Sequence, residues 1–175
     1  MPPSELADRL AIADLVNAYA QRVDHHDAAG VAALFTTDGT LSIHGDVGVV
    51  APTSVCHGRA EIERTIAAMA YRTTCHLIGN HLAAIDRDEA TGETRCVAHH
   101  VSGSPGTEVD RVWYLRYEDR FARCDDGRWR IAERVLRLDI VERRSLAQVQ
   151  AGTAPAGGGS PLPGSPLPGS PLPGR

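Results

Sequence analysis

The feature that most constrains the fold is a change in hydrophobic periodicity near residue 70. Before this point apolar residues recur at helical spacing, as Ile12, Val16, Tyr19 and Val23 do. After it, apolar and polar residues alternate along four runs, at about Thr73–Ile85, Thr94–Ser102, Val109–Arg123 and Arg128–Val141. Helices followed by a meander of long strands predict an α+β fold, with helices packed on one face of a curved, mainly antiparallel sheet that encloses a pocket.

Three helices are expected ahead of the sheet. The first carries the apolar stripe described above. Asp27 is expected to cap a second, short helix that runs through Leu34 and Phe35. A short strand at Leu41 and Ile43 and a loop follow, and a third helix covers about residues 60–70. One face of each helix is therefore available to bury against the sheet.

Charge and cysteine content exclude several classes of function. The formal net charge of the 175 residues is −4, and acidic and basic residues are interspersed. This balance does not match a nucleic-acid-binding or membrane-surface protein. The cysteines show no CxxC pair or metal-ligand spacing, and Cys75 and Cys96 lie in strand patterns where a thiol usually packs as a small apolar group. We expect a reduced, cytoplasmic protein that has neither a signal peptide nor a membrane span.

The last part of the chain has a different composition. The unit Gly-Ser-Pro-Leu-Pro occurs three times between Gly159 and Pro173. Two prolines in five residues are incompatible with a helix or an interior strand. We therefore expect one domain over residues 1–150 and a disordered tail over residues 151–175. The alternative is that the tail is a proline-motif ligand for another protein, although nearby basic residues are lacking.

Two segments about fifty residues apart suggest a proton-transfer pair. Asp24 ends the amphipathic stretch from Leu15, and His76 lies early in the apolar strand Thr74–Asn80. A carboxylate bound to one ring nitrogen of histidine fixes the tautomer and raises the basicity of the other nitrogen. Such a pair could remove a carbon-bound proton near neutral pH. The alternative is that His76 is a core histidine bound to a backbone carbonyl.

The strand pattern around His76 indicates which side chains accompany it. Alternation groups His76 with Ile78 and Leu82 on an interior face, and it places His81 on the opposite face in a structural role. Asp24 is followed by His25 and His26, but consecutive helical residues diverge by about 100 degrees and cannot converge on one ion. We therefore expect no metal site. Motifs for nucleotide cofactors are also missing from the sequence.

The chain resembles the SnoaL-like branch of the NTF2-like superfamily from about residue 5 to residue 142. Besides the two segments above, three stretches carry the resemblance, at residues 34–39, 116–123 and 126–134. This branch includes scytalone dehydratase, a bile-acid dehydratase, hexachlorocyclohexane dehydrochlorinase and polyketide cyclases. The resemblance implies a cone-shaped fold with three N-terminal helices, an Asp24–His76 catalytic dyad and no cofactor. The same fold hosts several reactions and also proteins without catalysis.

The resemblance extends to two further catalytic candidates. Tyr19 stands where related dehydratases use a tyrosine or lysine to polarise the substrate, and it could equally be a core tyrosine. His99 and His100 point to opposite faces of their strand, and alternation does not decide which one faces the pocket. Scytalone dehydratase has a second pocket histidine at about this distance after the first. The resemblance therefore favours His100.

Arg134 is a candidate for substrate binding. It alternates with Ala132 and Leu136 on one strand face, and a guanidinium among small and apolar residues needs a partner. That partner could be Asp24, a substrate oxygen, or an acid of the preceding strand, Glu118 or Asp119. The dehydrochlorinase has an arginine at the matching place, so the resemblance allows a pocket role beside the structural one.

The remaining candidates concern the pocket wall and assembly. Trp113 and Tyr117 share a strand face and are expected to line the pocket, although core or interface positions are equally compatible with the pattern. The long strands carry apolar residues on both faces, so one face would remain as a wet apolar patch on a monomer. We expect a homo-oligomer built through the outer sheet face, with a trimer favoured by the resemblance and a dimer possible.

These features lead to three functional hypotheses. The first is a cofactor-independent lyase that dehydrates a small, mainly apolar hydroxy-carbonyl compound of steroid, polyketide or aromatic type. The second is an isomerase, cyclase or dehalogenase that uses the same dyad. The third is a non-catalytic protein that binds a small molecule or a partner. The distance between Asp24 and His76 discriminates the catalytic hypotheses from the third.

Overall fold

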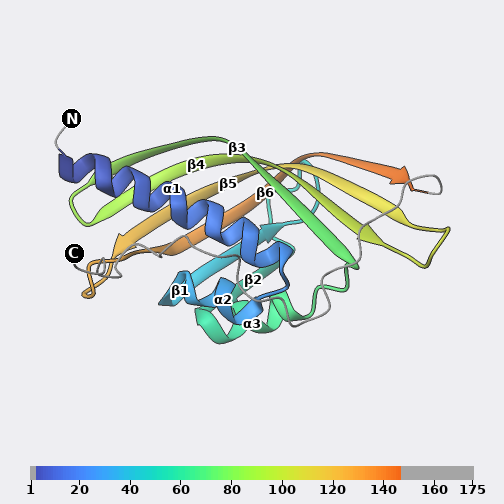
Figure 1. The fold of residues 1–175 in the computed structure, drawn as a ribbon, viewed down its shortest axis with the longest axis horizontal. Helices are drawn as coiled ribbons and strands as arrows, with labels where there is room; N and C mark the ends of the chain where they lie inside the picture. The colour runs from blue at the N-terminus through green and yellow to red at the C-terminus, as the bar shows by residue number, and fades with distance from the viewer. Residues whose placement is uncertain (1–2, 147–175) are drawn as a thin grey trace, which may run out of the picture.

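A computed structural model describes residues 3–146 of the chain, in which three helices precede or interrupt six strands (Figure 1). The helices are α1 (Pro3–Asp24), α2 (Ala28–Ala33) and α3 (Gly58–Ala67). The strands are β1 (Phe35–His44), β2 (Ser54–His57), β3 (Thr73–Asp86), β4 (Glu89–Ser102), β5 (Val109–Arg123) and β6 (Trp129–Ser145). The expected boundary at residue 150 and the repeat tail lie outside the described residues. Among the described helices, none is both long and apolar enough to cross a membrane.

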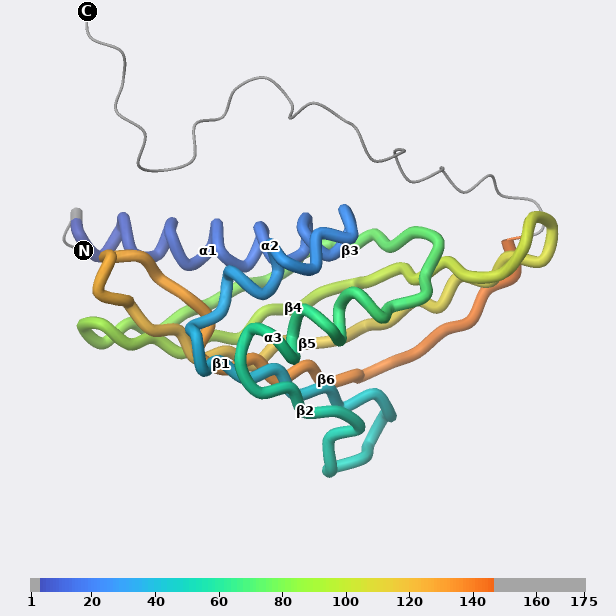
Figure 2. Tube along the Cα trace, turned by 90° about the horizontal axis from the view of Figure 1, so that it is seen from below, coloured from blue at the N-terminus to red at the C-terminus, as the bar shows by residue number. Residues whose placement is uncertain are grey.

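The six strands form one curved sheet in the order β2-β1-β6-β5-β4-β3. All neighbouring strands are antiparallel except β1 and β6, which are parallel, so the sheet is mixed. Helix α1 runs along the sheet beside the edge strand β3, while α2 and α3 lie near β1 and β2 (Figure 2). The expectation of an α+β fold with three N-terminal helices packed on a curved sheet is confirmed.

The helices follow from local sequence chemistry. Ile12, Val16 and Val23 of α1 are each at most 3% exposed, as the helical spacing of these residues predicts. The carboxylate of Asp27 accepts a hydrogen bond from the backbone N–H of Gly30 at 2.8 Å and caps α2. An N-terminal cap of this kind contributes about 1 kcal/mol. The buried stripe of α1 thus joins the sheet's inner side chains in one core.

Several strand boundaries differ from the sequence-based expectation. Strand β1 already begins at Phe35, which was expected to belong to the second helix, and its register with β6 shifts between Phe35 and Thr40. The short strand β2 lies where the pattern showed none. Strand β4 starts at Glu89, five positions before the expected start. The polar segments at these positions are held by backbone pairing with neighbouring strands, which the hydrophobic pattern does not report.

A bulge in β3 changes which residues share a face with His76. Ile78 pairs with Cys96, but the next pair joins His81 to Thr94, so β3 has one extra residue. Past the bulge, His81 turns inward and Leu82 turns outward, where it is 81% exposed. The expectation that Leu82 is interior is therefore wrong. Cys75 is exposed as well, whereas Cys96 is buried as expected.

Two further bulges lie where β6 pairs with β5. One falls between the Leu115–Leu138 and Tyr114–Ile140 pairs and leaves Asp139 as the extra residue. The other leaves Ala132 as the extra residue, so Ala132 does not continue the alternation that contains Arg134. We call the face that carries the buried Leu115, Tyr117 and Leu138 the inner face, and the opposite face the outer face.

Candidate active site

Asp24 and His76 meet where the end of α1 lies against the edge strand β3. Nδ1 of His76 lies 2.6 Å from Oδ1 of Asp24, and the backbone N–H of His76 donates to Oδ2 at 2.9 Å. The side chain of His76 is 5% exposed and that of Asp24 is 23% exposed. Because the carboxylate binds Nδ1, the ring is held with its proton on Nδ1 and with Nε2 available as a base.

Thr74 completes the hydrogen bonding of Asp24. Its hydroxyl donates to Oδ1 of Asp24 at 2.8 Å, and Thr74 is itself buried. Burial alone would raise the pKa of Asp24, but hydrogen bonds from the ring and backbone of His76 and from Thr74 outweigh it. The pKa of Asp24 is therefore held below its ordinary value of 3.8. Asp24 is a charged acceptor at neutral pH and can stabilise an imidazolium on His76.

His100 lies beside His76 on the inner face. The two imidazole rings stand edge to face with centroids 5.5 Å apart. Trp113 and Tyr71 flank His100 with ring centroids at 4.0 Å and 4.7 Å. Burial, and then the neighbouring His76, lower the pKa of His100 from 6.5 to about 4. His100 is neutral near pH 7, and its buried Nδ1 has no hydrogen-bond partner among the described residues.

His99 takes the opposite face of β4. Its Nδ1 lies 2.7 Å from Oδ2 of Asp110, so the outer face carries a second histidine–carboxylate pair. Alternation in the sequence left open which of His99 and His100 faces inward. The register of β4 against β3 and β5 determines it. His100 is the histidine that joins His76.

Tyr19, Tyr117 and Arg134 gather deeper in the core. Arg134 is fully buried, and it makes a bidentate ion pair with Asp119 at 2.8 Å and 2.7 Å. The guanidinium carbon lies 4.1 Å from the ring centroid of Tyr19 and 4.2 Å from that of Tyr117. Of the partners considered for Arg134, the structure places Asp119 against it. We call these four residues the buried arginine cluster.

The buried arginine cluster is charged but closed to solvent. Desolvation lowers the pKa of Arg134, but the charge and hydrogen bonds of Asp119 outweigh it and raise the pKa above the ordinary value of 12.5. Burial raises the pKa of Tyr19 and of Tyr117. The contacts of Tyr19 are to this cluster and to Phe35, so its surroundings are those of a core tyrosine. Nη1 of Arg134 has no hydrogen-bond partner within residues 3–146.

Asp24 and His76 border a surface pocket at the seam between α1 and β3, whose lining does not include His100 or Trp113. The pocket has a volume of about 380 Å³, and its lining also includes His25. Across the described part of the chain, no three His, Cys, Asp or Glu side chains are grouped so that they could hold a metal ion. Asp24 supplies a charged acceptor, His76 an oriented imidazole and His100 a neutral imidazole, and such groups suit proton transfer at an apolar ligand.

Sequence reasoning missed two residues of this arrangement. Thr74 binds Asp24, and Tyr71 packs on His100, yet neither belongs to a recognisable motif. The alternation of β3 does place Thr74 on the face of His76, which is a signal that could have identified it. Tyr71 lies in the connection before β3, where no periodicity applies.

The comparisons with known proteins agree with this fold. The model of the SnoaL-like domain matches residues 4–135. A candidate scytalone dehydratase from Novosphingobium aromaticivorans is 23% identical, with a TM-score of 0.69 over 91% of this chain and 100% of that one. A hexachlorocyclohexane dehydrochlorinase, LinA-type3 from Novosphingobium barchaimii, is 16% identical, with a TM-score of 0.67 over 80% of this chain and 92% of that one.

A third solved structure is Rv3472, a protein of unknown function from Mycobacterium tuberculosis. It is 28% identical to this chain, with a TM-score of 0.66 over 79% of this chain and 77% of that one. No curated protein matches the sequence. Because the family model covers most of the chain, and the fold and the solved structures agree with it, the chain belongs to the SnoaL-like domain family.

Proposed function

We propose that the protein is a cofactor-independent lyase that dehydrates a small, mainly apolar hydroxy-carbonyl compound. The observation that carries the proposal is the 2.6 Å contact between Asp24 and Nδ1 of His76, which leaves Nε2 free to accept a proton. An imidazole oriented by a fixed carboxylate is a group of the kind that acts as a general base in proton abstraction. The solved structures of a candidate scytalone dehydratase and of a dehydrochlorinase share the fold, and their names are compatible with an elimination.

The proposed reaction starts with removal of the proton next to the substrate carbonyl. Nε2 of His76 takes this proton, and Asp24 stabilises the imidazolium that forms. The electron pair moves onto the carbonyl oxygen as an enolate, which His100 can stabilise with a hydrogen bond. The enolate then reforms the carbonyl, the carbon–oxygen bond of the hydroxyl group breaks, and the hydroxyl leaves as water with the proton from His76. The step is redox-neutral and requires no cofactor.

His100 is better supported than Tyr19 as the second polar group of this mechanism. It lies 5.5 Å from His76 between ring centroids, whereas Tyr19 packs against the guanidinium of Arg134. A pKa near 4 keeps His100 uncharged, so it can face His76 without opposing protonation of the dyad. Tyr71 and Trp113 would form the apolar wall against which the substrate packs.

A screen of hydroxy-carbonyl compounds tests the proposal. Loss of water is followed by mass and by the absorbance of the conjugated product, with the protein and its His76→Ala variant in parallel. The matched control is His99→Ala, which removes a histidine that is also paired to a carboxylate but on the outer face. We expect turnover in the protein and in the control, and a loss of at least about 10²-fold in His76→Ala.

Three results would speak against dehydration. Equal turnover in the His76→Ala variant would remove the dyad from the mechanism. Conversion without loss of water would favour an isomerase, cyclase or dehalogenase, all of which begin with the same proton removal. Tight binding of the compounds without conversion would favour a ligand-binding protein.

A further inference from the structure

A row of directly paired residues leads from the dyad across the inner face. Thr74 pairs with His100, His100 pairs with Arg111, and Arg111 pairs with Arg143. The adjacent row joins His76, Ala98, Trp113 and Val141. The ring centroids of Trp113 and His100 are 4.0 Å apart, so both side chains lie on the inner face. Arg111 stands two positions before Trp113 on β5, and its side chain therefore projects from the same face.

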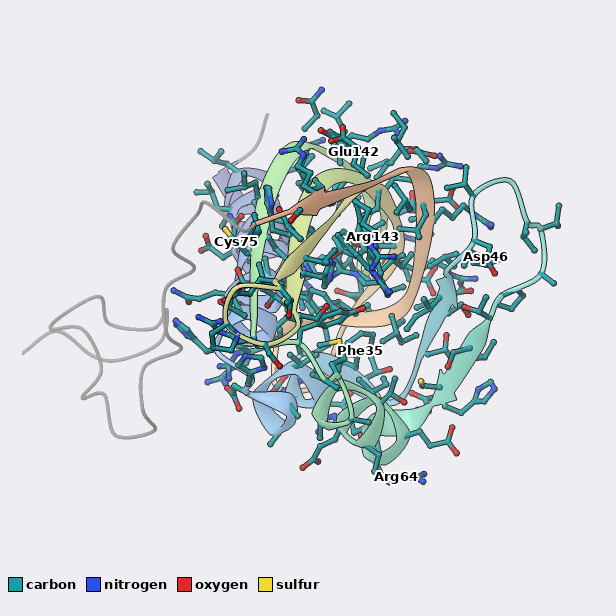
Figure 3. All side chains as sticks on the ribbon, turned by 90° about the vertical axis from the view of Figure 1, so that its right-hand side faces the viewer. Phe35, Asp46, Arg64, Cys75, Glu142 and Arg143 are labelled. Atoms are coloured by element: carbon teal, nitrogen blue, oxygen red, sulfur yellow. The ribbon has the colours of Figure 1, made fainter. Side chains whose placement is uncertain are left out.

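The bulge at Asp139 decides that Arg143 belongs to this row. Past the bulge Val141 stands opposite Trp113 and Arg143 stands opposite Arg111, so their side chains project from the inner face. Figure 3 places Arg143 inside the curve of the sheet and Glu142 outside it. Without the extra residue, the alternation from Leu138 would place Ile140 and Glu142 on the inner face instead.

Arg111 and Arg143 are both exposed, and neither is paired within the described part of the chain. Neither side chain has a hydrogen bond or ion pair to any residue between positions 3 and 146. Arginines directly opposite each other on neighbouring strands repel, and this arrangement costs stability when no anion lies between them. Two neighbouring arginines that lack a partner among residues 3–146 and lie beside His76, His100 and Trp113 are therefore a charge that a ligand could neutralise.

The acidic side chains of this region are engaged elsewhere. Asp110 binds His99, and Glu142 binds Arg144 on the outer side. Glu108 accepts a hydrogen bond from Arg72 at 2.8 Å and another from the backbone N–H of Gly106. No described carboxylate is thus within bonding distance of Arg111 or Arg143.

We propose that Arg111 and Arg143 bind an anionic group of the substrate, so that the substrate is an apolar hydroxy-carbonyl compound with a carboxylate or phosphate at one end. The apolar part would pack on Trp113 and Tyr71 with its reacting carbon toward His76. The anion would lie one row further along the strands, between two guanidinium groups whose planar donors suit carboxylate and phosphate oxygens. The inference rests on the proposed function only in locating the ligand at the same site.

The test measures binding of unreactive probes, so it does not depend on catalysis. Naphthoate, naphthyl phosphate and uncharged naphthamide share one ring system and are compared by titration calorimetry at low salt. We expect the anions to bind about tenfold more tightly than the amide, with a preference that weakens as salt is raised. Comparison of the two anions distinguishes a carboxylate from a phosphate as the preferred group.

Two variants and a control locate the effect. Arg111→Gln and Arg143→Gln should each reduce the preference for the anions and leave binding of naphthamide unchanged. Arg120→Gln is the matched control, because Arg120 is an exposed arginine of the same strand as Arg111 whose side chain projects from the outer face. Melting curves should show no loss of stability in the Arg111 and Arg143 variants, since each removes one member of a repelling pair.

Three outcomes would overturn the inference. The protein could bind the amide as tightly as the anions, or it could bind neither anion. The third outcome is that the preference for anions survives in the Arg111→Gln/Arg143→Gln double variant. If the anions bind as expected and no hydroxy-carbonyl compound is dehydrated, the proposed reaction fails while the anion site stands. The two proposals are thus separable.

Discussion

The carboxylate of Asp24 binds both the ring and the backbone of His76, although 52 positions separate the two residues in the chain. Oδ1 of Asp24 is hydrogen-bonded to Nδ1 of the ring, and Oδ2 accepts a hydrogen bond from the backbone N–H of His76. The same side chain therefore orients the imidazole and satisfies a polar group at the exposed edge of β3. The proposed function and the docking of α1 on the sheet thus depend on the same residue.

Asp24→Asn and His76→Ala should each lower turnover by at least about 10²-fold, because the first removes the charge that stabilises the imidazolium and the second removes the base. The free energy of unfolding should change by no more than about 1–2 kcal/mol, since an asparagine oxygen can still accept part of the hydrogen bonding of Asp24. Steady-state kinetics and urea denaturation measure the two effects. Unchanged turnover in either variant would remove that residue from the mechanism.

Thr74→Val should alter the pH dependence more than the maximal rate. The hydroxyl of Thr74 donates to Asp24 and helps to lower its pKa, so removing the donor should raise that pKa and move the acidic limb of the rate profile to higher pH. We expect a fall of less than about tenfold at the optimum, because His76 keeps its own hydrogen bonds to Asp24. Thr74→Ser should restore the original profile. A profile unchanged in Thr74→Val would show that the hydroxyl has no effect on the dyad.

The protein should lose stability as the pH falls from about 6.5 toward 4. The pKa of His100 is lowered in the folded state, so the unfolded chain binds more protons in this window and folding becomes less favourable. The full shift corresponds to at most about 3 kcal/mol. Chemical denaturation at several pH values should show a flatter curve for His100→Asn.

His25→Asn is the matched control for the pH experiment, because His25 is exposed at the end of α1. It should retain the steep pH dependence of the original protein. Burial also lowers the pKa of His81, so the variant of His100 is expected to reduce the slope without abolishing it. Identical curves for the protein and His100→Asn would contradict the assignment to His100.

Asp119→Ala should destabilise the fold by about 3–5 kcal/mol, since it leaves the guanidinium of Arg134 buried without its counter-charge. The Asp119→Leu/Arg134→Met double variant should be more stable than Asp119→Ala, because no charge then remains in the core. Asp86→Ala removes an ion pair whose side chains are 83% and 88% exposed, and it should have little effect. Guanidinium denaturation compares the three. A mild effect of Asp119→Ala would mean that water reaches Arg134.

Self-association through the outer sheet face remains a prediction. Leu77, Val97, Tyr114 and Ile140 stand opposite one another across β3, β4, β5 and β6, and Leu77 and Ile140 are 55% and 56% exposed. We expect sedimentation to show a trimer, or otherwise a dimer, and Ile140→Arg to shift the population toward monomer. Arg120→Gln on the same face but outside this row should not. A protein that sediments as a monomer at low micromolar concentration would rule out this interface.

The class of the fold and the contact between Asp24 and His76 were accessible from the sequence. The change from a period near 3.6 to a period of 2 reports burial of one face in each element, and burial is a local property of the pattern. The α1 stripe, the three helices and the four long strands were predicted on that basis, whereas the short strand β2 was not. Asp24 and His76 were paired through the resemblance, because no local pattern encodes a contact across fifty residues.

The partners of the candidate residues were decided by the tertiary structure. Extra residues in β3 and β6 invert the alternation, so Leu82 faces solvent while His81 and Arg143 face inward. Arg134 had several possible partners in the sequence, and only the register of β5 against β6 sets Asp119 opposite it. Alternation predicts the face of each side chain only along a stretch of strand without a bulge. The position of a bulge depends on the pairing with a neighbouring strand, which the local sequence pattern does not contain. Which side chains meet at the site is therefore a property of the assembled sheet.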